Sequence, residues 1–320
     1  MENMKYVDVF NGDADGICAL HQLRLTEPKD SHLLTGVKRD INLLNRVEAE
    51  EGDRVTVLDI SLDKNREGLV RLLNSGVQVI YFDHHFAGEI PAHHNLETHI
   101  DTDANICTSL LVNAYLGGTY LPWAVTAAFG DNLFSAAENA AQSLNLKASQ
   151  LDELKLLGTC INYNGYGAIV DDLIFPPETL YKLIKPYADP FDFIRNEEGY
   201  QTLLNGYRDD VVMAESMQPE FTSDTHALYI LPDAKWARRV SGVFANQLAQ
   251  NNPKRAHAML TQQADSSYVV SVRAPLNNKT GADELCRQFE TGGGRKAAAG
   301  INHLPEAEYA RFLQAFVEAF

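Results

Sequence analysis

Short apolar runs alternate with helix-like segments over the first hundred residues. Runs with the character of buried strands are residues 5–10 (KYVDVF), 31–37 (SHLLTGV), 53–61 (DRVTVLDIS) and 76–85 (GVQVIYFDHH). Helical patterns follow the first run and precede the last one, where Leu69, Leu72 and Leu73 are the apolar positions. Apolar strands that alternate with helices are typical of a parallel sheet in an α/β domain.

The pattern changes twice further along the chain. Residues 105–215 are mainly helical, and a second α/β pattern begins near Thr225 with strands at 226–232, 255–261 and 267–275. We therefore expect an N-terminal domain over residues 1–190, a connector over 191–220, and a smaller α/β domain over 221–320.

Acids and histidines recur where the predicted strands end. Asp13 and Asp15 follow the first strand, Asp59 ends the third, and Asp83, His84 and His85 end the fourth. The carboxyl ends of parallel strands meet at one edge of a sheet, where α/β proteins bind their ligands. Alone, DADG would be a solvated turn and LDIS a capped strand end, but their recurrence favours a shared site.

Composition limits the kinds of partner that we expect for this protein. The net charge is −16, from 43 acids against 27 bases, so a long nucleic acid would be repelled unless a local basic patch attracts it. The four cysteines are scattered and no apolar stretch is long enough to span a bilayer, so we expect a cytoplasmic protein that contacts no membrane.

Clustered carboxylates repel one another unless cations lie between them. Oxygen-rich ligation with one imidazole suits Mn²⁺, or Mg²⁺ as the alternative, better than zinc thiolate chemistry. Two ions bridged by a carboxylate can generate a hydroxide near neutral pH and hold both oxygens of an in-line phosphoryl displacement.

Four short motifs then identify a family resemblance. NGDADG, LDIS, FDHH and FGDN, in this order, resemble the motifs of the DHH phosphoesterase superfamily. SVRAP followed by GGGRKAAAG resembles the DHH-associated substrate-binding domain with its glycine-rich loop. The resemblance covers most of the chain. It implies a parallel-sheet catalytic domain, a helical connector and a smaller α/β substrate-binding domain.

The resemblance also implies roles for individual residues. A pair of Mn²⁺ ions would be bound by Asp13, Asp15, Asp59, His84 and Asp131, with Asp59 bridging the two ions. His85 would contact the scissile phosphate, and Asp83 would orient an imidazole. Substrate binding in the second domain would involve Arg273, Gly292, Gly293, Gly294 and Arg295.

Four further positions are relevant to the resemblance. Many family members carry a histidine ligand where this chain has Val9, and the glycine-rich loop usually continues with histidine where this chain has Arg295. Arginine still suits a phosphate, through its bidentate fork. Thr108 and Ser109 match a small hydroxyl pair of the family, although helix capping or packing explains them equally well.

We expect a Mn²⁺-dependent phosphodiesterase of the nanoRNase type, which cleaves short oligonucleotides, above all linear 5′-phosphorylated dinucleotides, to mononucleotides. The substrate would span both domains, its terminal phosphate on the second. The alternatives are a cyclic-dinucleotide phosphodiesterase and a non-catalytic nucleotide sensor. Expected partners are the substrate and a second copy of the chain in a homodimer, but no long nucleic acid.

Overall fold

The computed structural model describes residues 4–320, which form two compact units. Unit 1 ends at Asn205 and unit 2 comprises Gly206–Phe320. The division falls within helix α9 (Glu198–Glu215), which begins in unit 1 and ends in unit 2.

Unit 1 is built on a parallel sheet. Its strands are β1 (Tyr6–Phe10), β2 (His32–Leu34), β3 (Arg54–Leu58), β4 (Gln78–Asp83) and β5 (Leu96–Ile100), in the order β2-β1-β3-β4-β5. Its remaining helices are α1 (Ala14–Thr26), α2 (Leu62–Asn74), α3 (Thr108–Tyr115), α4 (Leu121–Gly130), α5 (Phe134–Ala141), α6 (Ala148–Gly165), α7 (Pro177–Ile184) and α8 (Pro190–Asn196). All four strand pairings are parallel, which confirms the predicted α/β class.

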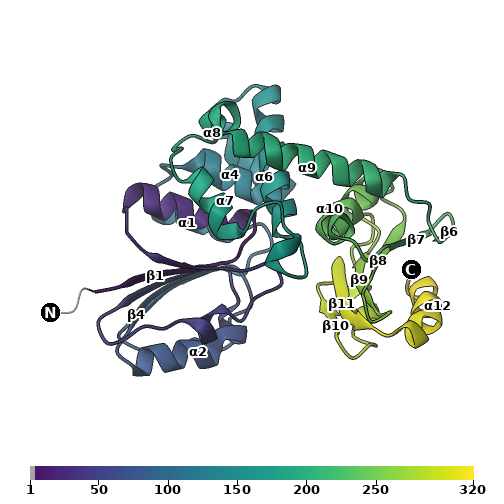
Figure 1. The fold of residues 1–320 in the computed structure, drawn as a ribbon, viewed down its shortest axis with the longest axis horizontal. Helices are drawn as coiled ribbons and strands as arrows, with labels where there is room; N and C mark the ends of the chain where they lie inside the picture. The colour runs from purple at the N-terminus through teal and green to yellow at the C-terminus, as the bar shows by residue number, and fades with distance from the viewer. Residues whose placement is uncertain (1–3) are drawn as a thin grey trace. The chain divides into compact units, whose positions relative to one another are not determined.

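The two faces of this sheet are covered by different helices. Figure 1 shows α1 on one face and α2 on the other. Val7 and Val9 of β1 pack into the core on the α2 side, whereas Asp8, between them, bonds to Arg24 of α1. The alternation of side chains along the strand thus places apolar residues on one face and a buried ion pair on the other.

The helices α4 and α6 approach each other at two glycines. A Cβ atom on Gly158 would lie 2.0 Å from the carbonyl oxygen of Thr126. One on Gly130 would lie 2.8 Å from the carbonyl oxygen of Gly158 and 2.4 Å from the Cβ of Ala14 in α1. Side chains at these positions would force the helices apart. The close approach holds the end of α4, and with it Asp131, beside the start of α1.

Unit 2 has a mixed sheet of its own. Its strands are β6 (Phe221–Thr222), β7 (His226–Leu231), β8 (Ala256–Gln262), β9 (Tyr268–Arg273), β10 (Gly292–Gly294) and β11 (Ala298–Leu304), in the order β10-β11-β9-β8-β7-β6. Its helices are α10 (Lys235–Asn251), α11 (Ala282–Cys286) and α12 (Tyr309–Ala319). The β7–β8 pair is parallel and the other pairs are antiparallel.

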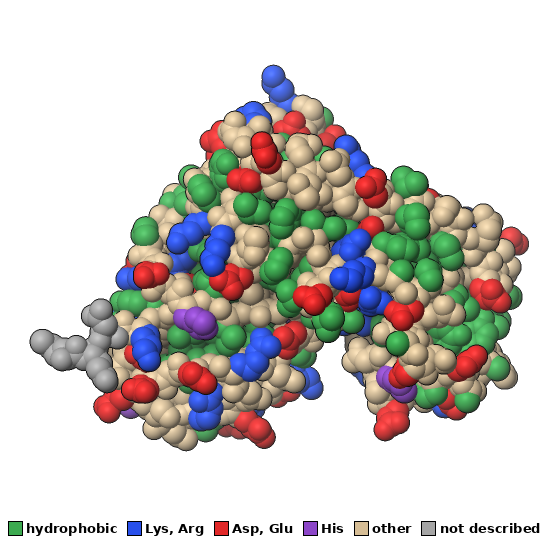
Figure 2. All heavy atoms as spheres, in the orientation of Figure 1, with side chains coloured by type: hydrophobic (Ala, Val, Ile, Leu, Met, Phe, Trp, Pro, Cys, Tyr) green, Lys and Arg blue, Asp and Glu red, His purple; other side chains and the backbone are tan. Residues whose placement is uncertain are grey.

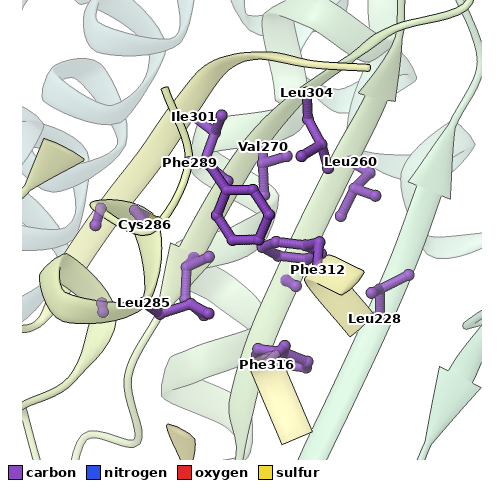
Figure 3. Packing of buried hydrophobic residues seen from close by; sticks show 14 of the residues in the cluster. Leu228, Leu260, Val270, Leu285, Cys286, Phe289, Ile301, Leu304, Phe312 and Phe316 are labelled. Atoms are coloured by element: carbon purple, nitrogen blue, oxygen red, sulfur yellow. The ribbon is translucent and has the colours of Figure 1, made fainter. Parts of the chain in front are cut away.

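Each face of the second sheet has a core. On one face, Phe312 and Phe316 of α12 pack against Val270 and Leu260 of the strands (Figure 3). On the other, a cluster includes Phe244 of α10 and residues of β7 and β8. In the described part of the chain, no helix is both long and apolar enough to cross a membrane.

Candidate metal centre and active site

The carboxyl-end edge of the first sheet collects the residues that the sequence singled out. Asp13 caps α1 directly after β1, and Asp15 lies in the first turn of that helix. Asp59 follows β3, His84 follows β4, and Asp131 follows α4. The structure therefore brings the five predicted metal ligands to one place, while their roles stay predictions.

His84 is at the centre of this group. Its Nε2 atom lies 3.5 Å from Asp59, 3.8 Å from Asp131 and 4.0 Å from Asp15. Atoms bound to one small divalent ion at about 2.1 Å can lie at most about 4.2 Å apart. All three distances therefore allow each carboxylate to share an ion with His84.

The tautomer of His84 suits this role. Its Nδ1 atom lies 2.9 Å from the carbonyl oxygen of Ile106, which can only accept a hydrogen bond, so Nδ1 carries the proton. Nε2 then presents its lone pair toward the acids, as it does in a metal-binding histidine oriented by a backbone carbonyl.

Asp15 is held rigidly by the first turn of α3. The backbone amides of Thr108 and Ser109 each donate to its carboxylate at 2.7 Å. The Thr108 hydroxyl donates to Asp59 at 3.2 Å, and the Ser109 hydroxyl donates to the Asp15 carbonyl. The Thr108–Ser109 pair thus fixes two candidate ligands, which explains these residues better than helix packing alone.

The acids are buried and crowded. Burial, with repulsion from Asp131 and Asp13, raises the pKa of Asp15. Burial and the neighbouring acids Asp13 and Asp15 also raise the pKa of Asp59 well above its usual value. Such a donor set, carboxylates around one imidazole, is chemically suited to a divalent cation, which would relieve the repulsion.

Asp59 also has an unusual backbone. Its φ angle is 59°, in the left-handed region that non-glycine residues rarely adopt. Its amide donates to the carbonyl oxygen of Phe82 on the neighbouring strand, which holds this conformation. Strain of this kind is concentrated at functional sites.

His85 faces a different partner. Its Nδ1 atom lies 2.7 Å from Asp83, whose carboxylate also accepts the amide of His84. The predicted orienting role of Asp83 fits this contact. The His85 side chain is 35% exposed, so a substrate could reach it, although its Nδ1 atom also lies 3.9 Å from Asp59. Its predicted contact with phosphate remains a prediction.

Lys38, in the loop after β2, is a site residue that sequence reasoning missed. Its Nζ atom lies 2.5 Å from Asp13, 3.0 Å from the side-chain oxygen of Asn162 and 3.6 Å from Asp131. Burial would lower the pKa of Lys38, but attraction to Asp13, Tyr166 and Asp131 outweighs it and raises that pKa. Lys38 is therefore an ammonium ion inside the acidic cluster.

The predicted substrate-binding residues lie at one end of the second sheet. Gly292–Gly294 are an edge strand, β10, and not the expected loop, because they pair with β11. Arg295 lies in the turn between these strands, where it exchanges backbone hydrogen bonds with Ala298, the β11 residue that pairs with Arg273. The Arg273 guanidinium bonds to Asn246 of α10, whereas the Arg295 side chain is exposed.

Comparison with known proteins gives matches among structures alone. No family model matches the sequence. No curated protein matches it either. An exonuclease RecJ structure bound to manganese matches with a TM-score of 0.63 and 18% identity, over 98% of this chain and 89% of that one. RecJ from Thermus thermophilus in complex with Mn²⁺ matches with a TM-score of 0.67 and 18% identity, over 98% of this chain and 51% of that one.

A third solved structure matches over the full length of both proteins. The pGpG-specific phosphodiesterase PggH from Vibrio cholerae has a TM-score of 0.56 and 15% identity, over 98% of each chain. RecJ and PggH both have the fold that the sequence motifs had predicted. This chain therefore has the fold of the DHH phosphoesterases.

Proposed function

We propose that this protein is a divalent-metal-dependent phosphodiesterase that hydrolyses short oligonucleotides. The observation that carries the proposal is the position of His84, whose Nε2 atom lies within 4.0 Å of three carboxylates from three different segments. A bound divalent ion would supply a Lewis acid for a phosphoryl oxygen and lower the pKa of a coordinated water. Mn²⁺ is our candidate, because both RecJ structures contain it.

We assign different roles to the residues around the proposed ion. Asp15, Asp59, His84 and Asp131 would hold the ion, and the amides of α3 keep Asp15 in position. His85, oriented by Asp83, would donate a hydrogen bond to the phosphate. The resemblance implies a pair of ions, but the contacts of Lys38 argue for one.

Linear 5′-phosphorylated dinucleotides are the proposed substrates. A net charge of −16 disfavours a long polyanion, and basic and acidic side chains are mixed on the face shown in Figure 2. PggH is specific for the dinucleotide pGpG and matches over the same length. In unit 2, the exposed Arg295 beside the β10 glycines would bind a terminal phosphate.

The test is a substrate panel with the full chain and Mn²⁺. It compares pGpG, longer oligonucleotides, a cyclic dinucleotide and pyrophosphate, with Asp59→Asn as the inactive control. We expect mononucleotides to be released fastest from pGpG, and chelation to stop the reaction. A preference for the cyclic substrate would favour the cyclic-dinucleotide alternative. No turnover of any substrate by metal-loaded protein would favour a nucleotide sensor.

A further inference from the structure

Two groups of candidate ligand atoms lie at the metal centre, and they share His84. One group is Asp15, His84 and Asp131, and the other is Asp59, His84 and His85. Asp13, which the sequence predicted to hold an ion, belongs to neither group in the described part of the chain.

Both oxygens of the Asp13 carboxylate are engaged by the protein itself. Oδ1 accepts the amides of Asp15 and Gly16, each at 3.1 Å, as the cap of α1. Oδ2 accepts the ammonium group of Lys38. Asp13 therefore already has a cation as its partner, and this cation lowers its pKa against the effect of burial.

The Lys38 ammonium has the surroundings of a bound cation. It has three hydrogens, and three side-chain oxygens surround it, from Asp13, Asn162 and Asp131. The backbone is fixed as well, because the Lys38 amide donates to Gly165 and its carbonyl accepts the side chain of Asn11. These contacts define a built position, unlike that of a surface lysine.

Asp131 connects this ammonium to His84. Its Oδ1 atom lies 3.6 Å from Lys38, and its Oδ2 atom lies 3.8 Å from His84 Nε2. With a divalent ion at His84, Asp131 would lie between that ion and the ammonium, as a carboxylate lies between the two cations of a two-metal centre. A second metal ion between Asp13 and Asp131 would have to displace Lys38, since like charges in one position repel. Val9 offers that ion no ligand, because its side chain is a hydrocarbon, which packs in the core.

We propose that Lys38 serves as a built-in cation in place of one metal ion, so that the centre binds a single divalent ion near His84. Four carboxylates, from Asp13, Asp15, Asp59 and Asp131, carry four negative charges. The ammonium and one divalent ion would leave a net charge of about −1. In the reaction, Lys38 is a positioning residue that holds Asp13 and Asp131 in place. The inference rests on the proposed function for the identity of the ion.

The experiment measures the metal content of the protein and the magnetic-resonance spectrum of the bound metal, not turnover. Metal-free full-length protein is equilibrated with Mn²⁺, bound Mn²⁺ is counted by dialysis and elemental analysis, and electron paramagnetic resonance separates single ions from coupled pairs. We expect one uncoupled ion in the wild type and in Lys38→Arg, and a second, coupled ion in Lys38→Met. Lys64→Met removes an exposed lysine of α2 and should leave one ion.

A coupled pair in the wild type would overturn the inference even if no variant folds, and so would a single ion in folded Lys38→Met. The panel assay on the same samples separates this inference from the proposed function. Two bound ions with pGpG turnover would leave the function standing and remove the inference. One bound ion without turnover of any phosphodiester would leave the inference standing and remove the proposed function.

Discussion

At the scale of single residues, Asp59 has three features that each lower the stability of the fold and that a purely structural residue would not need. Its carboxylate is buried, its neighbours are acids, and its backbone is in the left-handed region. Asparagine tolerates that backbone and carries no charge, so it would give the folded protein more stability at this position. An aspartate at this position fits the role that we propose for Asp59 as a metal ligand.

Replacing Asp59 with asparagine should therefore separate activity from stability. Turnover of pGpG should fall by roughly a hundredfold or more, the scale seen when one group is lost from a preorganised charged site. Without metal, the free energy of unfolding should rise by about 1 kcal/mol, because a buried charge has been removed. Denaturant melts and initial rates measure the two effects. A variant with wild-type turnover would show that Asp59 is not a ligand.

His85 should act on the substrate and not on the ion. Its ring is bonded to Asp83, which leaves His84 as the imidazole that faces Asp15, Asp59 and Asp131. His85→Ala should lower turnover roughly tenfold to a hundredfold, the value of about 1.5–3 kcal/mol for a hydrogen bond to a charged group.

The accompanying measurement for His85→Ala is a calorimetric Mn²⁺ titration. Metal stoichiometry should equal that of the wild type and of His94→Ala, which removes an exposed histidine. Loss of a whole metal equivalent would make His85 a ligand, as its 3.9 Å distance from Asp59 allows, and would reverse the roles given to the histidines.

At the scale of secondary-structure elements, the sequence predicted the strands that have a clear apolar pattern. The strands β1, β3 and β4 consist mainly of apolar residues, so their ends and the acids after them could be located. β5 was missed because LETHI is half-exposed and contains few apolar residues. β10 was missed because three glycines give no strand pattern, and pairing with β11 alone makes them a strand.

The β10–β11 turn should set the preference for short substrates. Removing Arg295 should lower kcat/KM for pGpG roughly tenfold to a hundredfold, because an arginine bonded to phosphate contributes on the order of 1.5–3 kcal/mol. A generic activated phosphodiester, which lacks the terminal phosphate, should be hydrolysed as by the wild type.

Arg287→Ala is the matched control for Arg295→Ala, because it removes another exposed arginine of unit 2. Equal losses on both substrates would mean that Arg295 supports the fold or the metal centre. No loss on either substrate would mean that this turn has no part in binding phosphate.

At the scale of the whole molecule, the sequence predicted two α/β regions but not the contacts that complete the metal centre. The ends of the predicted strands located Asp13, Asp59 and His84 on one edge of the sheet. Lys38 stands 25 residues from Asp13 and 124 from Asn162, with no local pattern to mark it. Only the folded chain, through the backbone bond from Lys38 to Gly165, brings this lysine to the acids.

The two units should respond differently to metal, because each has its own cores and all five predicted ligands lie in unit 1. Scanning calorimetry of the full chain should show two transitions. At a free Mn²⁺ concentration of about 100 times Kd, binding stabilises the folded state by about 2.7 kcal/mol. For a unit of this size, that corresponds to a rise in Tm of roughly 5–10 °C. The rise should be confined to one transition, be reversed by a chelator and be absent in Asp59→Asn. An equal shift of both transitions would contradict the assignment of the metal centre to unit 1 alone.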